Sequence, residues 1–241
     1  MKRLVIVLAL VAAVMSNMAL GRWYGALFVG PQRDATAVSV MLDALGELRT
    51  FLAQDIWFEI DIYHHQMERE GIHWTQERDL MSMYRMVTTL DPRFVEAYDV
   101  GSYQLVENFH LVGEGLEYLD EGLRNNPDSA LLHFNKAFLM YYLKRYKEAA
   151  TEAGYAMALY APDPAALLQM SGPDQIPFLN ALRIFAHAER MQGDKITEVH
   201  ALRIWLTVRP GDDYPIRRLK ELNEAPAGYT PEQYLNGTRI R

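Results

Sequence analysis

The stretch NPDSALLHFNKAFLMYYLKRYKEAATEAGYAMALYAP, residues Asn126 to Pro162, decides the fold. Apolar residues recur at helical spacing from Ala130 to Leu143 and again from Lys147 to Leu159, and a short polar turn separates the two segments. Small side chains stand where two antiparallel helices would approach each other: Ala137, Ala149, Ala153 and Ala156. The stretch therefore predicts a helical hairpin.

This pattern resembles the tetratricopeptide repeat (TPR), a hairpin of about 34 residues that stacks on further copies because it cannot bury its apolar face alone. The resemblance covers residues 48–222. It implies an all-α fold, a right-handed α-solenoid of about four TPR-like hairpins. TPR proteins act as scaffolds and adaptors, so the resemblance implies binding to other proteins and not an enzyme.

Prolines and glycines mark the boundaries of the other units. Residues 48–71 are expected to form a long first helix, and residues 76–90 its partner, which Pro92 ends. The second unit, residues 92–127, is one residue longer than the TPR period, and we expect the extra residue near residues 108–113. The fourth unit pairs residues 178–191 with residues 195–208 across a Gly193-Asp194 turn.

Departures from the pattern follow the third unit. Residues 162–177 are rich in proline, which predicts an insertion or ordered loop without a helix of useful length. Trp205 stands where a TPR prefers alanine, so we expect either that the last two helices splay or that a pocket receives the indole. Residues 215–222 are expected to form a closing helix, and residues 223–241 an extended tail.

The N-terminus predicts a membrane anchor. Lys2 and Arg3 precede an apolar run over residues 4–20, which favours a signal anchor or transmembrane helix at residues 1–21, followed by a membrane-proximal connector and helix at residues 22–47. A cleaved secretory signal is the alternative, but the candidate cleavage sites are poor. The positive charges place the soluble domain on the extracytoplasmic side, in the periplasm or its equivalent.

Composition excludes several classes of function. The net charge of −7 and the lack of a Lys/Arg-rich run argue against a nucleic-acid partner. The chain has no cysteine, which rules out disulfides and cysteine zinc sites. No phosphate-binding loop, dinucleotide fingerprint, nucleophile elbow or zinc-protease helix is present, so we expect no cofactor and no catalytic residue.

One cluster has the residue types of a metal site. His64 and Glu68 stand four apart, as do Asp61 and His65, and His73 follows. Imidazole and carboxylate groups suit a divalent transition metal. The two pairs face different directions, however, and such groups near a helix end are more often solvated. A metal-binding protein or small metal-dependent enzyme using His64, His65 and Glu68 therefore remains an alternative.

The TPR resemblance also implies a binding groove, lined by the first helix of each unit. In the third unit the groove positions hold an aromatic set: Leu131, Phe134, Phe138 and Tyr141. In the fourth unit they hold a polar, basic set: Asn180, Arg183, His187 and Arg190. In the second unit they hold Glu96, Asp99 and Tyr103. The groove would thus change from acidic through aromatic to basic along its length.

Such a gradient would orient a bound peptide, with the aromatic groups supplying affinity. Arg183 and Arg190, with His187 between them, are expected to hold a carboxylate of the partner. The alternatives are an aromatic set in the core and an ordinary solvated face on the basic helix. We expect a membrane-tethered scaffold that captures another membrane or envelope protein, or alternatively a permanent structural subunit of a large membrane complex.

Overall fold

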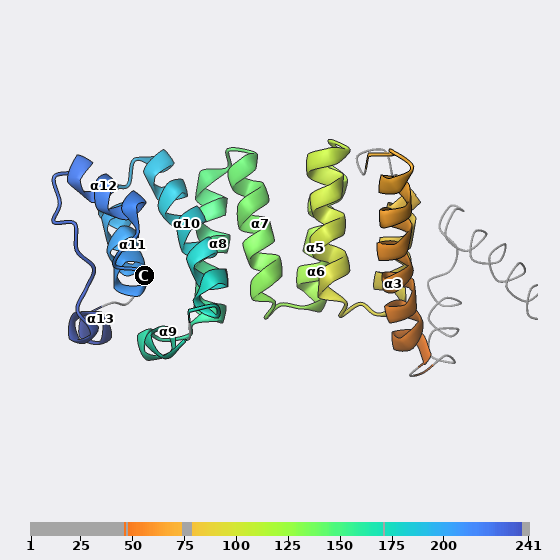
Figure 1. Cartoon of the computed structure of the whole chain (residues 1–241), viewed down its shortest axis with the longest axis horizontal. Helices are drawn as coiled ribbons and strands as arrows, with labels where there is room; N and C mark the ends of the chain where they lie inside the picture. Colours follow the sequence, from red (N-terminus) through yellow and green to blue (C-terminus); the bar gives the residue numbers. More distant parts are fainter. Residues whose placement is uncertain (1–45, 47, 74–78, 171, 238–241) are drawn as a thin grey trace, which may run out of the picture. The chain divides into compact units, whose positions relative to one another are not determined.

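The protein is all-helical in the part of the chain that the structure describes. This computed structural model describes residues 46, 48–73, 79–170 and 172–237, and no strand occurs among them. The chain divides into two compact units, residues 1–49 and 50–241, and nearly all the described residues belong to the second. Within that unit the helices follow one another in chain order (Figure 1).

The expected membrane helix at residues 1–21 and the connector at residues 22–47 lie outside the described residues, apart from Gly46. Among the helices that are described, none is both long enough and apolar enough to span a bilayer.

Consecutive helices pack against each other as hairpins. α5 packs on α6, α7 on α8, and α10 on α11, while α4 leads into α5 and α8 joins the third hairpin to α10. Trp57 of α3 lies 6.0 Å from Tyr84 of α4 between ring centroids. The long helices are α3 (Leu48–Arg69), α4 (Asp79–Leu90), α5 (Val95–Tyr103), α6 (Val112–Asn125), α7 (Ala130–Tyr142), α8 (Tyr146–Tyr160), α10 (Gln175–Gln192) and α11 (Lys195–Val208).

The hairpin of α7 and α8 has the predicted bounds to within one residue. The N-cap residue of α7 is Ser129, whose hydroxyl accepts a hydrogen bond from the Leu132 amide at 3.3 Å. The predicted small residues are all fully buried: Ala137, Ala149, Ala153 and Ala156. Methyl side chains thus let the two helices come close, which confirms the hairpin.

A π-helical turn follows α5, close to where the sequence predicts one extra residue in the second unit. Residues Gln104–Asn108 continue α5 with wider turns, and the Phe109 amide donates to the Gln104 carbonyl five residues earlier, at 3.1 Å. A π turn holds one residue more than an α turn, so the register of the flanking segments is kept. The insertion lies at the end of the first helix, slightly before the predicted position.

The proline-rich segment contains a short helix, so the prediction of a loop there is wrong in part. α9 (Pro164–Gln169) begins at Asp163, whose carboxylate accepts from the Ala166 amide at 2.7 Å. Proline is tolerated in a first helical turn because its missing N–H is not needed there. For the same reason α10 starts before Pro177, at Gln175, and not after it.

The C-terminal segment packs on the helices, which corrects the extended tail. After α12 (Asp213–Glu221), which matches the predicted closing helix, the chain turns back and forms α13 (Pro231–Gly237). The Tyr229 hydroxyl lies 2.7 Å from His200 Nδ1 of α11, and Tyr234 is only 3% exposed. α13 also contacts α9. Aromatic residues in an otherwise polar tail thus anchor it to the core.

The Trp205 indole is received by a pocket, the second of the two outcomes expected for this residue. It is 4% exposed, and its Nε1 donates to Asp212 Oδ2 at 2.7 Å. The hydrogen bond satisfies the one polar group of the indole, which burial would otherwise leave unpaired.

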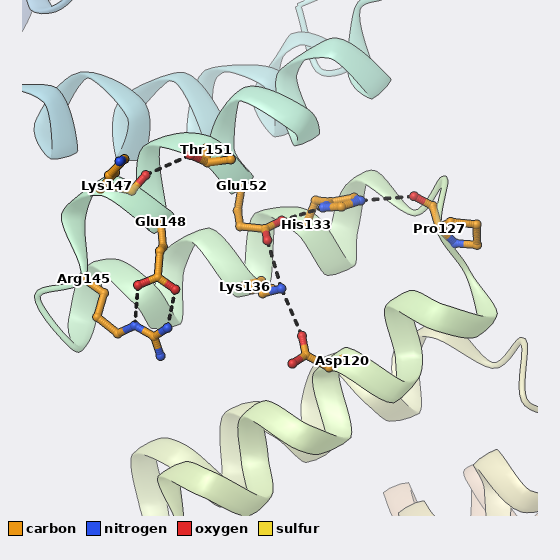
Figure 2. A network of polar contacts seen from close by, with 9 residues as sticks. All are labelled: Asp120, Pro127, His133, Lys136, Arg145, Lys147, Glu148, Thr151 and Glu152. Atoms are coloured by element: carbon orange, nitrogen blue, oxygen red, sulfur yellow. Dashed lines mark hydrogen bonds and ion pairs between the residues drawn. The ribbon is translucent and has the colours of Figure 1, made fainter.

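A polar network joins the second hairpin to the third (Figure 2). Lys136 Nζ lies 3.0 Å from Asp120 of α6 and 2.9 Å from Glu152 of α8. His133 of α7 lies 2.7 Å from the same Glu152 through Nδ1, and its Nε2 lies 3.1 Å from the Pro127 carbonyl. Because acceptors face both ring nitrogens, the arrangement favours the doubly protonated imidazolium.

This network makes stability depend on pH. The hydrogen bond to Glu152 raises the pKa of His133 above its ordinary value of 6.5, although burial and Lys136 oppose the change. The network's contribution is therefore complete below that value and is lost as pH rises through the raised pKa. We expect the free energy of unfolding to fall as pH rises above 6.5 and through the raised pKa of His133, and to fall less in a His133→Gln variant. Chemical unfolding across this range measures it.

His65→Gln is the matched control, because it removes an imidazole at an exposed position. The free energy of unfolding of His133→Gln could instead depend on pH in the same way as that of the unmodified protein and of His65→Gln. That result would show that folding does not favour the protonated form of His133.

Candidate functional site

The first helices of three consecutive hairpins lie next to one another. α5 packs on α7, and α7 packs on α10. The aromatic positions predicted for the groove, Phe134, Phe138 and Tyr141, are neither fully buried nor fully exposed. A side chain of this kind can contribute both to the protein interior and to a binding surface.

A cleft of about 400 Å³ lies between α5 and α7, and we call it the acidic–aromatic cleft. Asp99 and Tyr103 line it from α5. Leu131, Phe134 and Phe138 line it from α7, so the structure brings together five of the predicted groove residues. Sequence reasoning missed part of the lining: Val100, Gln104 and Asn135. Gln104 lies in the π turn, which changes the direction in which the following side chains point. A search for α-helical periodicity does not detect this change.

Asp99 is the charged group of this cleft. Burial, and then the nearby Glu96 carboxylate, raise the pKa of Asp99 to about 6, while Asn135 opposes the change. The backbone around it is fixed, because Asn135 Nδ2 donates to the Asp99 carbonyl at 2.9 Å and to Ser102 Oγ at 3.0 Å. A partly desolvated carboxylate in a fixed position is a strong potential partner for a cation.

Aromatic contacts connect the three helices across this face. The rings of Tyr103 and Phe138 have centroids 6.2 Å apart, which joins α5 to α7. Tyr141 and His187 are 6.3 Å apart with an edge contact, which joins α7 to α10. His187 then stacks on Tyr214 of α12 at 5.1 Å. The ring contacts thus form two groups, one from α5 to α7 and one from α7 through α10 to α12, and Phe138 and Tyr141 stand one helical turn apart on α7.

A second cleft, of about 380 Å³, lies between α10 and α12, and we call it the arginine cleft. Arg183 and His187 line it, with the Arg183 guanidinium 5.4 Å from the centre of the Trp205 ring. Burial, and then Arg190 and Arg183, lower the pKa of His187, so this imidazole is neutral near pH 7. The positive charge of the predicted clamp therefore comes from the two arginines.

The arginine cleft also contains groups that the sequence did not point to. Asp212, Asp213 and Tyr214 line it, although they follow α11 and belong to no TPR groove position. Asp212 is engaged by the Trp205 indole. Neither Arg190 nor Asn180 lines this cleft, although Arg190 is exposed one helical turn beyond His187. Arg183 and Arg190 form no ion pair with any described residue, so both remain available to a partner.

The candidate metal residues are not gathered into a coordination site. His65 lies 3.6 Å from Asp61 and 3.5 Å from Glu68, with side chains more than 60% exposed. The rings of His64 and His65 have centroids 5.7 Å apart. Among the residues whose placement is described, no group of three or more histidine, aspartate or glutamate side chains has the geometry to hold a metal ion.

The face formed by α5, α7 and α10 thus offers a carboxylate, several aromatic rings and two exposed guanidinium groups that no described carboxylate pairs with. Groups of these kinds can bind another molecule through apolar contact and charge. No family model matches the chain, and no curated protein is similar to it.

Proposed function

We propose that residues 48–222 form a right-handed α-solenoid of about four TPR-like hairpins, and that the face of α5, α7 and α10 captures a segment of another protein. The observation that supports this most is that two groups of ring contacts meet on α7, with a cleft beside each. Tyr103 contacts Phe138 in the first group, and His187 contacts Tyr141 and Tyr214 in the second. Aromatic groups beside charges of opposite sign provide both affinity and direction for a bound peptide.

Residues 4–20 would tether this scaffold to a membrane, with the helical domain on the extracytoplasmic side. A tether raises the effective concentration of two proteins held at the same membrane, so modest contacts on the face would suffice for capture. The partner we propose is accordingly a membrane or envelope protein.

The proposal predicts that reversing both free arginine charges abolishes capture. In an Arg183→Glu, Arg190→Glu variant, we expect recovery of the partner to fall at least about tenfold, because a partner carboxylate would meet like charges. The tagged full chain is crosslinked in native membranes, and mass spectrometry quantifies the proteins recovered with it. Circular dichroism checks that the variant keeps its helices.

The matched control is Arg124→Glu with Lys147→Glu, two exposed cations on α6 and α8 that do not line either cleft of the proposed face. Loss of the partner in both variants would indicate an effect of net charge alone. Equal recovery of a partner with the unmodified protein and with both variants would show that the two arginines do not contribute to the interface. It would favour a permanent subunit that is held by other surfaces.

A further inference from the structure

The acidic–aromatic cleft has the composition of a site for an organic cation. Its charged lining residue is Asp99, and the aromatic rings of Tyr103, Phe134 and Phe138 lie around the same space. Among the residues that the structure describes, no lysine, arginine or histidine lines it. Electron-rich ring faces and a carboxylate attract the same kind of ligand, a positively charged group on an apolar stem.

Asp99 also lacks a cation within the described part of the protein. It forms no ion pair there, and the charged group that acts on it is another carboxylate, Glu96, one helical turn away. A third carboxylate, Glu107, lies near the Tyr103 hydroxyl. Burying a carboxylate without a cation beside it costs free energy, and burial accordingly raises the pKa of Asp99. A ligand cation would remove the penalty.

We infer that the acidic–aromatic cleft binds an alkylammonium group, such as a lysine side chain, with Asp99 pairing with the ammonium and the rings covering its stem. The inference rests on the proposed function in one respect, since the lysine would belong to the captured segment. It adds the chemistry of that segment: a basic residue bound between α5 and α7, and an acidic group bound near Arg183 and Arg190.

The rest of the lining fits this ligand better than its alternatives. Leu131 and Phe134 provide apolar contact for a methylene chain. An anion would be repelled by Asp99 and Glu96, and a neutral alkyl chain would leave the Asp99 carboxylate desolvated and without a countercharge. The buried amide of Asn135 is already engaged, because it donates to the Asp99 carbonyl and to Ser102.

The test uses the full chain, purified in detergent, and two small probes. The first is Nα-acetyl-lysine N-methylamide, and the second is the norleucine analogue, which keeps the alkyl stem and lacks the ammonium group. Calorimetry measures affinity, and fluorine NMR of fluorotyrosine-labelled protein locates the site through the Tyr103 signal, assigned with Tyr103→Phe. We expect saturable binding of the lysine probe with a shift of that signal, and binding of the norleucine probe at least about tenfold weaker.

Two variants complete the test. Asp99→Asn is nearly isosteric and keeps the backbone carbonyl that Asn135 bonds, and it should weaken the lysine probe about tenfold or more. Phe138→Leu removes a ring without changing charge, and should weaken binding of the lysine probe about threefold. Glu117→Gln, an exposed carboxylate on α6 outside the cleft, is the control and should have no effect.

Equal binding of the two probes, an unchanged affinity in Asp99→Asn, or no saturable binding of the lysine probe would each overturn the inference. These results are separate from the partner test. Absence of lysine binding with arginine-dependent partner capture would overturn the ammonium site alone. Lysine binding without any protein partner would support the site and overturn the proposed capture function.

Discussion

Replacing Gly122 with alanine is expected to destabilise the protein by about 1–3 kcal/mol, the usual effect of overpacking a close contact. A Cβ atom at this position would lie 2.6 Å from Cγ and 2.8 Å from Cβ of Tyr98. Tyr98 is completely buried, and its ring centroid lies 4.9 Å from that of Tyr118. The ring cannot move away, because its hydroxyl also donates to Glu121 and accepts from Asn125.

Gly154 of α8 supplies the matched control. It is also a helical glycine, but a Cβ built there meets no atom within 4 Å. Alanine loses less conformational entropy than glycine when a helix forms, so Gly154→Ala should stabilise the protein by roughly 0.5–1 kcal/mol. The same substitution is thus expected to have opposite signs in α6 and α8.

Chemical unfolding of the full chain measures both effects, with the dependence of free energy on denaturant concentration checked for constancy. If Gly122→Ala stabilises the protein as much as Gly154→Ala does, the close approach of α5 and α6 described above is wrong.

The second large effect is expected at the ion pair between α11 and α12. The Glu198 carboxylate is almost completely buried, and Arg218 donates to it through Nε at 2.6 Å and Nη2 at 3.1 Å. Removing one partner leaves the other charge buried and unpaired. We expect Arg218→Met to cost about 3–5 kcal/mol, the usual result of breaking a buried pair.

A double variant separates this penalty from the net value of the pair. Glu198→Met with Arg218→Met removes both charges and should be more stable than Arg218→Met alone, because an apolar pair of similar volume leaves no charge unsatisfied. Arg145→Met is the exposed control, since Arg145 pairs with Glu148 at the surface, and should change stability by about 0–1 kcal/mol. A double variant less stable than Arg218→Met alone would contradict this account.

Local sequence patterns predicted the helices well. The helix at residues 195–208 was predicted with the bounds that α11 has, and the turn before it contains Gly193 at φ 80°, a left-handed conformation that glycine adopts without strain. Such features depend on nearest neighbours in the chain, so periodicity and capping residues are enough to predict them. Asp163 followed by Pro164 is a local pattern of the same kind, because it is typical of a helix start. The other prolines around it favour a loop, and the sequence therefore did not predict α9.

Contacts between distant residues could not be predicted in this way. Asp212 and Tyr214 line the arginine cleft because the chain turns after α11, and nothing in their local sequence indicates which helix they meet. Tyr229 and Tyr234 pack on the core from a segment that has a polar, irregular sequence. The direction of these side chains depends on how the chain returns, which is a property of tertiary structure.

The packing of each hairpin on its neighbours in the chain has a consequence for how the protein is made. Few long loops must close before stabilising contacts form, so the entropic cost of folding is met in small steps. A hairpin could therefore become ordered soon after it leaves the ribosome, with the preceding one as its template. The contact between α9 and α13 is an exception, since it joins segments far apart in sequence and cannot form until α13 itself has been synthesised.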